Sequence, residues 1–226
     1  MKIFKGKAFF FKSILLHILL VLVISFVSIN FWENPINDAI INSSSATVET
    51  SKDVSLVIID NKSLESYRWP WARALYGEIF EYFTDYTQAK VVVFDSVLNS
   101  LDKERGPESD NFFFNTVKKS PNFVGGYMAR LTPYENIEKG SNYDKAFQQK
   151  FSIDISDKRT NNADRISDYR SLTMFPESYF NAQKYVGSVN LDLHPIDGVL
   201  RTSNDLISYN NNYYPSLALR TYLLSN

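Results

Sequence analysis

Two carboxylates in this sequence follow directly after apolar runs, and a tight aromatic corner lies between them. Asp60 ends the run VSLVIID, and Asp95 ends the run AKVVVFD. Between them, the stretch WPWAR groups Trp69, Trp71 and Arg73 around one proline, in a chain with only three tryptophans. Paired carboxylates can hold a metal ion or carry out acid–base chemistry, and an aromatic corner beside an arginine can contact a ligand. These five residues are therefore the first candidates for a functional site.

The motifs of the common enzyme classes are missing from the sequence. There is no Gly-rich phosphate loop, no GxSxG nucleophile elbow and no HExxH motif. The chain has no cysteine, which excludes disulfides and thiolate metal sites, and His194 lies in a turn sequence. We therefore expect no enzyme activity, no metal site and no cofactor. A carboxylate-dependent enzyme that uses Asp60 and Asp95 is the weaker alternative.

The elements that position these residues read as a strand, a helix and a second strand. Val54–Asp60 is continuously apolar and β-branched, as in a strand buried on both faces, and Ala89–Asp95 has the same pattern. From Trp71 to Tyr86, apolar residues recur at steps of three and four, which predicts a helix. The short joints predict a parallel βαβ unit, with both aspartates at the carboxyl edge of the sheet, where open α/β folds bind ligands.

Arg73 falls in the first turn of this predicted helix, where a cation opposes the helix dipole. We therefore expect a carboxylate partner for Arg73, either Asp60 or Asp95. Each candidate also has a purely structural alternative. Asp60 and Asp95 would then bind loop amides or Arg73, and Trp69 and Trp71 would pack the corner. Pro70 disfavours the helical conformation at the residue before it and so sets the turn.

The next part of the chain predicts further α/β structure. Glu108–Lys119 reads as a helix and Phe123–Met128 as a third strand. Residues 130–172 are polar and read as a surface excursion in which only Tyr143–Phe151 has helical character. The core is therefore expected to be an α/β fold with a βαβ parallel core.

The last part of the chain predicts an added antiparallel hairpin. The strands YVGSVNL, from Tyr185, and VLRTSNDLISY flank the turn HPIDG. Asp197 and Arg201 at this turn are further candidates for ligand contact, with turn formation and a salt bridge on the hairpin as their structural alternatives. A second turn is expected at residues 210–212, followed by a helix that begins at Pro215.

The N-terminal part of the chain has the pattern of a membrane anchor. Residues 8–32 form an apolar run of roughly 25 residues, enough to cross a hydrocarbon core of about 30 Å as a helix. The only charges before Glu33 are four lysines, so residues 1–7 are expected to stay in the cytoplasm and the rest to be exported. No small-x-small cleavage site follows the run, which favours an uncleaved anchor over a signal peptide.

Composition limits what the exported part can be. With 226 residues, 44% of them hydrophobic, the chain has room for one well-packed domain besides the anchor. Beyond the anchor there are 20 basic residues (24 − 4) against 25 acidic ones, a net charge of −5 that argues against nucleic-acid binding. We expect a connector at residues 33–53 and a single exported domain at residues 54–226.

The ordered motifs resemble the CHASE type-two family, an extracytoplasmic sensor domain of bacterial membrane receptors. The family pattern appears here as IID at 58–60, WPWAR at 69–73, VVVFD at 91–95, DGVLR at 197–201 and PSLAL at 215–219. The matches are collinear from about Asn37 to Leu224. Ala72 replaces the usual second proline, and the middle excursion is poorly matched.

The resemblance implies a sensory input domain in the bacterial cytoplasmic (inner) membrane, single-pass, with the main domain in the periplasm or outside. In related receptors this domain lies upstream of a cyclase, kinase or diguanylate cyclase domain. The resemblance therefore implies two partners, an unknown small-molecule or protein signal and an output domain. The output domain is either missing from this chain or part of a separate cytoplasmic protein. Ser25 and Ser28 in the anchor would permit a homodimer. An anchored scaffold protein that senses nothing is the alternative.

Overall fold

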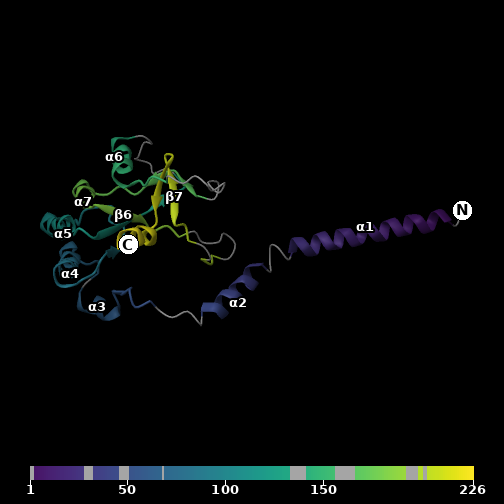
Figure 1. The fold of residues 1–226 in the computed structure, drawn as a ribbon, viewed down its shortest axis with the longest axis horizontal. Coiled ribbons are helices and arrows are strands. Elements are labelled where there is room, and N and C mark those ends of the chain that lie inside the picture. The colour runs from purple at the N-terminus through teal and green to yellow at the C-terminus, as the bar shows by residue number, and fades with distance from the viewer. Residues whose placement is uncertain are drawn as a thin grey trace. The chain divides into compact units, whose positions relative to one another are not determined.

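The structure is a computed structural model that describes residues 3–27, 33–45, 51–67, 69–132, 141–155, 166–191, 198–200 and 203–226. It divides into two compact units, Met1–Asp60 and Asn61–Asn226. The first unit holds two helices, and the second holds all the strands (Figure 1).

The N-terminal unit begins with the long helix α1 (Ile3–Val27), followed by α2 (Glu33–Ser45). Apolar side chains are exposed on every side of α1 from Ile14 to Ile24. In the stretches that the structure describes, no helix has both the length and the apolar character needed to span a bilayer.

The segment Val54–Asp60 is not the buried strand that the sequence predicts. These residues belong to no strand, and Val54 and Leu56 are 75% and 81% exposed. A run of β-branched residues makes an extended conformation favourable, but burial on two faces requires neighbours on both sides. In the structure these residues have no strand partner, so the prediction for this segment was wrong.

The main sheet of the second unit is parallel and has the order β1-β2-β6. Its strands are β1 (Val92–Phe94), β2 (Phe123–Tyr127) and β6 (Tyr185–Ser188). The register pairs Val93 with Val124 and Gly126 with Gly187. The predicted parallel core is confirmed, but the βαβ unit lies one strand later in the chain, with α5 (Pro107–Lys119) between β1 and β2.

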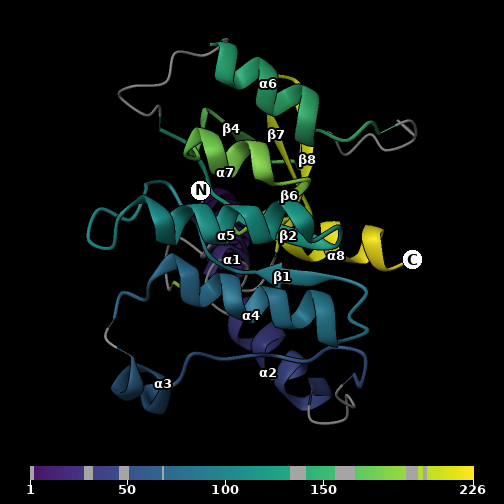
Figure 2. The ribbon, with the colours of Figure 1, turned by 90° about the vertical axis from the view of Figure 1, so that its left-hand side faces the viewer.

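Helices cover both faces of this sheet. The helices α4 (Arg73–Tyr86), α5 and α7 (Glu177–Ala182) form a layer on one face, in front of the strands in Figure 2, and α8 (Leu217–Ser225) covers the other. Two glycines in the strands allow the helices to approach the sheet closely. A Cβ at Gly125 would meet the Gln183 Oε1 and Tyr179 hydroxyl, and one at Gly187 would meet the Leu217 backbone. The fold therefore has a helix–sheet–helix layering around β2 and β6.

The antiparallel hairpin exists but joins strands other than those predicted. It consists of β7 (Leu206–Tyr209) and β8 (Asn212–Pro215), while the strand from Tyr185 pairs parallel with β2. Asn210 and Asn211 have φ values of 51° and 60°, as a tight two-residue hairpin turn requires. The turn at 210–212 is thus confirmed, whereas residues 194–197 of the HPIDG turn lie outside the described part.

Shorter elements complete the second unit. β4 (Asp168–Tyr169) adds parallel to β7, and β3 (Ala129–Arg130) pairs antiparallel with β5 (Ser171–Leu172). α3 (Asn61–Ser66) precedes the aromatic corner, and α6 (Asn142–Phe151) is the helix expected within the excursion. The helix expected from Pro215 is α8, whose N-cap is Ser216.

The core is built largely from aromatic rings. Phe80 of α4 lies 5.1 Å from Phe94, 5.8 Å from Phe113 and 5.0 Å from Phe123, measured between ring centroids. Pairs at such distances add about 0.5–1.5 kcal/mol each beyond the burial of their area. They fix α4 and α5 on the sheet and so hold the joint that precedes α4.

Candidate functional site at the start of α4

The two tryptophans of the corner differ in their surroundings. Trp71 is 7% exposed, and its indole Nε1 donates a hydrogen bond of 3.3 Å to the Tyr67 carbonyl. Its ring lies 5.8 Å from the rings of Tyr67 and Tyr76. Trp69, joined to Pro70 by a cis peptide bond, is 57% exposed. Trp71 therefore packs the corner, and Trp69 is the ring available to a ligand.

Arg73 is held by two groups from the loop and helix that follow β1. Its Nη2 donates to the Ser100 carbonyl at 3.3 Å, and its Nε lies 3.7 Å from Asp110 Oδ1. The Asp110 side chain is only 3% exposed and that of Arg73 18%. The ion pair is therefore largely buried, where charges interact more strongly than at the surface.

The sequence prediction of the Arg73 partner was wrong. We expected Asp60 or Asp95, but the ion pair joins Arg73 to Asp110 in the first turn of α5. The carboxylate of Asp110 interacts favourably with the dipole of α5, because it lies in the first turn of that helix. The cation of Arg73 lies in the first turn of α4 and interacts unfavourably with the dipole of α4. One ion pair thus balances the charges at the starts of two helices.

The starts of α4 and α5 are also joined by a hydrogen bond. Ala72, the N-cap of α4, offers no side-chain cap, and the Ala74 N–H instead donates to Ser109 Oγ at 3.0 Å. A side-chain oxygen supplied by another helix here satisfies an amide that the helix itself leaves without a partner. The two helices are therefore fixed to each other at their N-termini.

The loop between β1 and α5 is organised by two aspartates. Asp110 Oδ2 accepts from the Asp102 N–H at 2.9 Å, and Asp102 Oδ1 accepts from the N–H groups of Glu104 and Arg105 at 3.1 Å. Arg105 Nη1 lies 3.8 Å from Asp102 Oδ2. Asp110 thus accepts from the loop with one oxygen and faces Arg73 with the other.

The Arg73–Asp110 pair has polar atoms that make no hydrogen bond within the described part of the chain. Arg73 Nε and Asp110 Oδ1 are buried and make no hydrogen bond to the described residues, because 3.7 Å is too long for one. A buried polar atom without a partner is costly, and a site with such atoms can take up a water or a polar ligand group. The joint therefore combines a structural ion pair with free hydrogen-bonding positions.

Burial and two arginines act in opposite directions on tyrosine hydroxyls near the joint. Burial raises the pKa of the Tyr76 hydroxyl, and the positive charges of Arg73 and Arg105 partly oppose that rise. Burial likewise raises the pKa of Tyr179, again opposed by Arg73. Both phenols are therefore neutral at physiological pH, and neither supplies a charge to the site.

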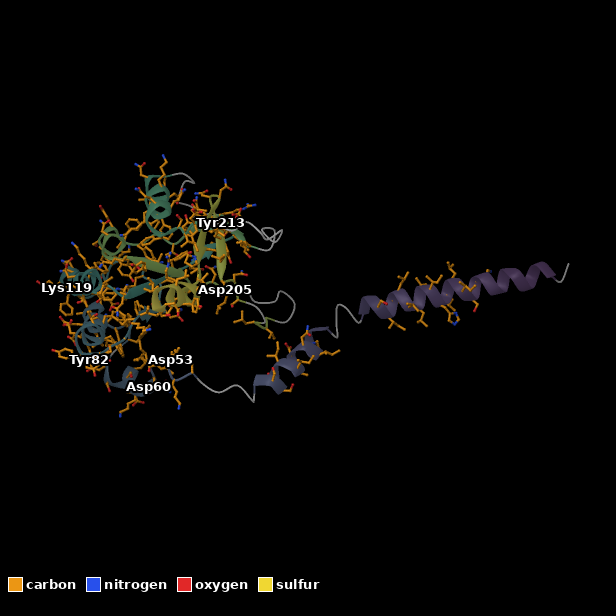
Figure 3. All side chains as sticks on the ribbon, viewed as in Figure 1. Asp53, Asp60, Tyr82, Lys119, Asp205 and Tyr213 are labelled. Carbon is orange, nitrogen blue, oxygen red and sulfur yellow. The ribbon has the colours of Figure 1, made fainter. Side chains whose placement is uncertain are left out.

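Two of the other predicted site residues, Asp60 and Asp95, lie in the part of the chain that the structure describes. Asp60 is exposed at the end of the N-terminal unit, directly before α3, and Asp95 is exposed directly after β1 (Figure 3 labels Asp60). Asp197 and Arg201 lie outside the described residues. Among the described side chains, no group of three or more histidine, aspartate or glutamate residues is arranged to hold a metal ion.

The sequence did not reveal that Asp110 and Ser109 contact the residues at the start of α4. One signal was present: Asp110 lies three, four and seven residues before Phe113, Phe114 and Val117, on the same apolar helix face. A carboxylate at the head of an apolar face will be buried, and a buried charge needs a cation.

Comparison with known proteins identifies a family for this chain. The family model described as "CHASE2 domain" matches residues 15–226. The chain therefore belongs to the CHASE2 domain family, whose members are extracytoplasmic sensory domains, as the motifs suggested. Neither the curated proteins nor the solved structures contain a match.

Proposed function

We propose that this chain is the sensory input part of a bacterial membrane receptor. Residues 8–32 anchor it in the cytoplasmic membrane with the N-terminus inside, and residues beyond about 33 are exported. The exported domain binds a signal, and the resulting change is relayed to a cytoplasmic output, in the same polypeptide or in a partner protein.

The match to the CHASE2 family over residues 15–226 is the observation that carries this proposal, because it covers the whole of the second unit and starts within α1. The exposed apolar side chains of α1 and the lysines that precede them support the anchor and its orientation. The exposed Trp69 and the unused hydrogen-bonding atoms of the Arg73–Asp110 pair make the start of α4 the candidate place for the signal.

The topology can be tested with reporter fusions after Asn226. Alkaline phosphatase, which is active only after export, is expected to be active there, and the matched β-galactosidase fusion inactive. The active fusion should remain in the membrane fraction at its full mass, because the anchor is not cleaved. An active β-galactosidase fusion, or a soluble product that begins near Asn30, would contradict the proposal.

A further inference from the structure

The charges of α4 oppose its helix dipole at both ends. Arg73 lies in the first turn, and Glu81 and Asp85 lie near the C-terminus, where the last turn has no basic residue. Asp110 balances Arg73, but no ion pair balances Glu81 or Asp85 within the part of the chain that the structure describes. Like charges four residues apart also destabilise a helix. Within the described residues, the carboxylates at the C-terminal end of α4 therefore have no ion-paired cation.

Two large aromatic side chains are exposed beside these carboxylates. Tyr82 and Tyr86 are 57% and 78% exposed, and their rings stack with centroids 5.9 Å apart and planes at 24°. Tyr82 lies on the outer side of the layer formed by α4 and α5 (Figure 3). Neighbouring exposed aromatic rings are typical of surfaces that bind partners.

A shallow pocket lies between the C-terminal ends of α4 and α5, next to the two carboxylates. It is lined by Glu81, Thr84, Asp85, Thr116, Lys119 and Ser120. Thr84 Oγ1 and Ser120 Oγ are hydrogen-bonded at 2.7 Å. Both helices end here. The last turn of α5 carries Lys118 and Lys119, whereas the last turn of α4 has no basic residue, so the negative dipole end of α4 favours a positive group in this pocket.

These features define a tyrosine–carboxylate face on α4, made of Glu78, Glu81, Tyr82, Asp85 and Tyr86. A charged helix face is ordinarily just solvated. Here, however, the carboxylates near the C-terminus destabilise the helix, and the side chains of this face are complementary to a cation. The carboxylates attract a cation, the stacked rings provide cation–π contacts, and the pocket accepts the cationic head.

We propose that the tyrosine–carboxylate face is a docking surface for a lysine- or arginine-rich segment of a partner protein. A basic side chain of the partner enters the pocket, and others lie across the tyrosine rings. Lys119, which also lines the pocket, competes with that side chain for the same carboxylates. This inference concerns a surface far along α4 from Arg73 and does not depend on the sensory function.

The test uses the full chain in detergent micelles and a dye-labelled, lysine-rich, alanine-based peptide as the probe. Fluorescence anisotropy measures the affinity. Tyr82→Ala with Tyr86→Ala, and separately Glu81→Gln with Asp85→Asn, are each expected to weaken binding about tenfold. Lys119→Ala is expected to tighten it. All these side chains are exposed, and far-UV circular dichroism confirms that each variant is folded.

Matched variants elsewhere distinguish docking from general attraction between opposite charges. Tyr222→Ala removes an exposed tyrosine of α8, and Glu65→Gln with Asp154→Asn removes two exposed carboxylates. These controls are expected to change the affinity by less than about twofold. Equal losses in the controls, or full affinity in the double tyrosine variant, would overturn the proposal. So would a homodimer that the α4 substitutions dissociate in the absence of peptide, because a second copy would then be the occupant.

Discussion

At the scale of single residues, the Arg73–Asp110 pair is the main feature of the candidate site. Asp110 is almost fully buried, and besides Arg73 it has one hydrogen-bond donor, the Asp102 N–H. A buried carboxylate that loses its cation is strongly destabilising. The pair therefore either holds the joint between helices or, if folding tolerates its loss, serves ligand binding.

We expect Arg73→Ala to lower the free energy of unfolding by about 3 kcal/mol, because Asp110 is left buried without a cation. Urea denaturation measures this, and a cycle with Asp110→Asn should show coupling of more than about 1 kcal/mol. Arg105→Ala, which removes a more exposed partner of Asp102, is the control and should cost less than about 1 kcal/mol.

A loss below about 1 kcal/mol for Arg73→Ala, like that of an exposed ion pair, would contradict a structural clamp. The joint would then be the leading candidate for the signal-binding site, since Arg73 would be kept for a purpose other than folding.

The sequence located this site only in part. The aromatic corner, the helix after it and the need for a counter-charge to Arg73 could be predicted, because proline chemistry and helix dipoles act locally. The identity of Asp110 could not, because it depends on how α5 packs against α4. Nor could the sequence decide that Trp71 is buried while Trp69 is exposed.

At the scale of elements, local patterns predicted helices and strands better than their pairing. α4, α5, β1, β2 and α6 lie close to the expected positions. Turn chemistry at HPIDG suggested a hairpin, but a turn fixes only a chain reversal and not the hydrogen-bond partner. The strand β6 has Val186, Gly187 and Ser188 all buried, and this continuous burial fits the interior of a parallel sheet.

The contact between β6 and α8 gives a prediction at this scale. A Cβ at Gly187 would lie 2.4 Å from Leu217 Cα and 2.7 Å from Leu217 N, so Gly187→Ala must displace the start of α8. We expect a loss of about 3 kcal/mol in the free energy of unfolding, measured by urea denaturation.

Gly106→Ala is the matched control, because a Cβ there meets nothing within 4 Å and the cost comes only from its φ of 75°. With ψ at 176°, this is a conformation essentially restricted to glycine, and it costs about 1–3 kcal/mol. A loss below about 1 kcal/mol for Gly187→Ala would contradict the tight packing of α8 on β6.

At the scale of the whole molecule, buried tyrosines make the second unit sensitive to alkaline pH. Burial raises the pKa of Tyr127 and Tyr179, both fully enclosed. The unfolded chain ionises its phenols near pH 10, while the folded chain keeps these two protonated. Above that pH the unfolded state binds fewer protons, so stability must fall as pH rises.

We therefore expect the free energy of unfolding, followed by urea denaturation, to fall as the pH rises through 10, with a slope that approaches about 1.4 kcal/mol per pH unit for each buried phenol above about pH 11. Tyr127→Phe should reduce this slope, and Tyr222→Phe, at an exposed position, should not. A slope that Tyr127→Phe leaves unchanged would contradict this account.

The layering of helices on the main sheet has a consequence for biosynthesis. All three strands of the sheet have been made once Ser188 is added to the chain, but the helix that covers one face begins only at Leu217, after β7 and β8. During synthesis, that face of β2 and β6 is therefore uncovered until α8 has been made. A nascent chain held at this stage would expose apolar side chains to chaperones and proteases. Quality control of the nascent protein is therefore expected to act on this face until α8 packs on it.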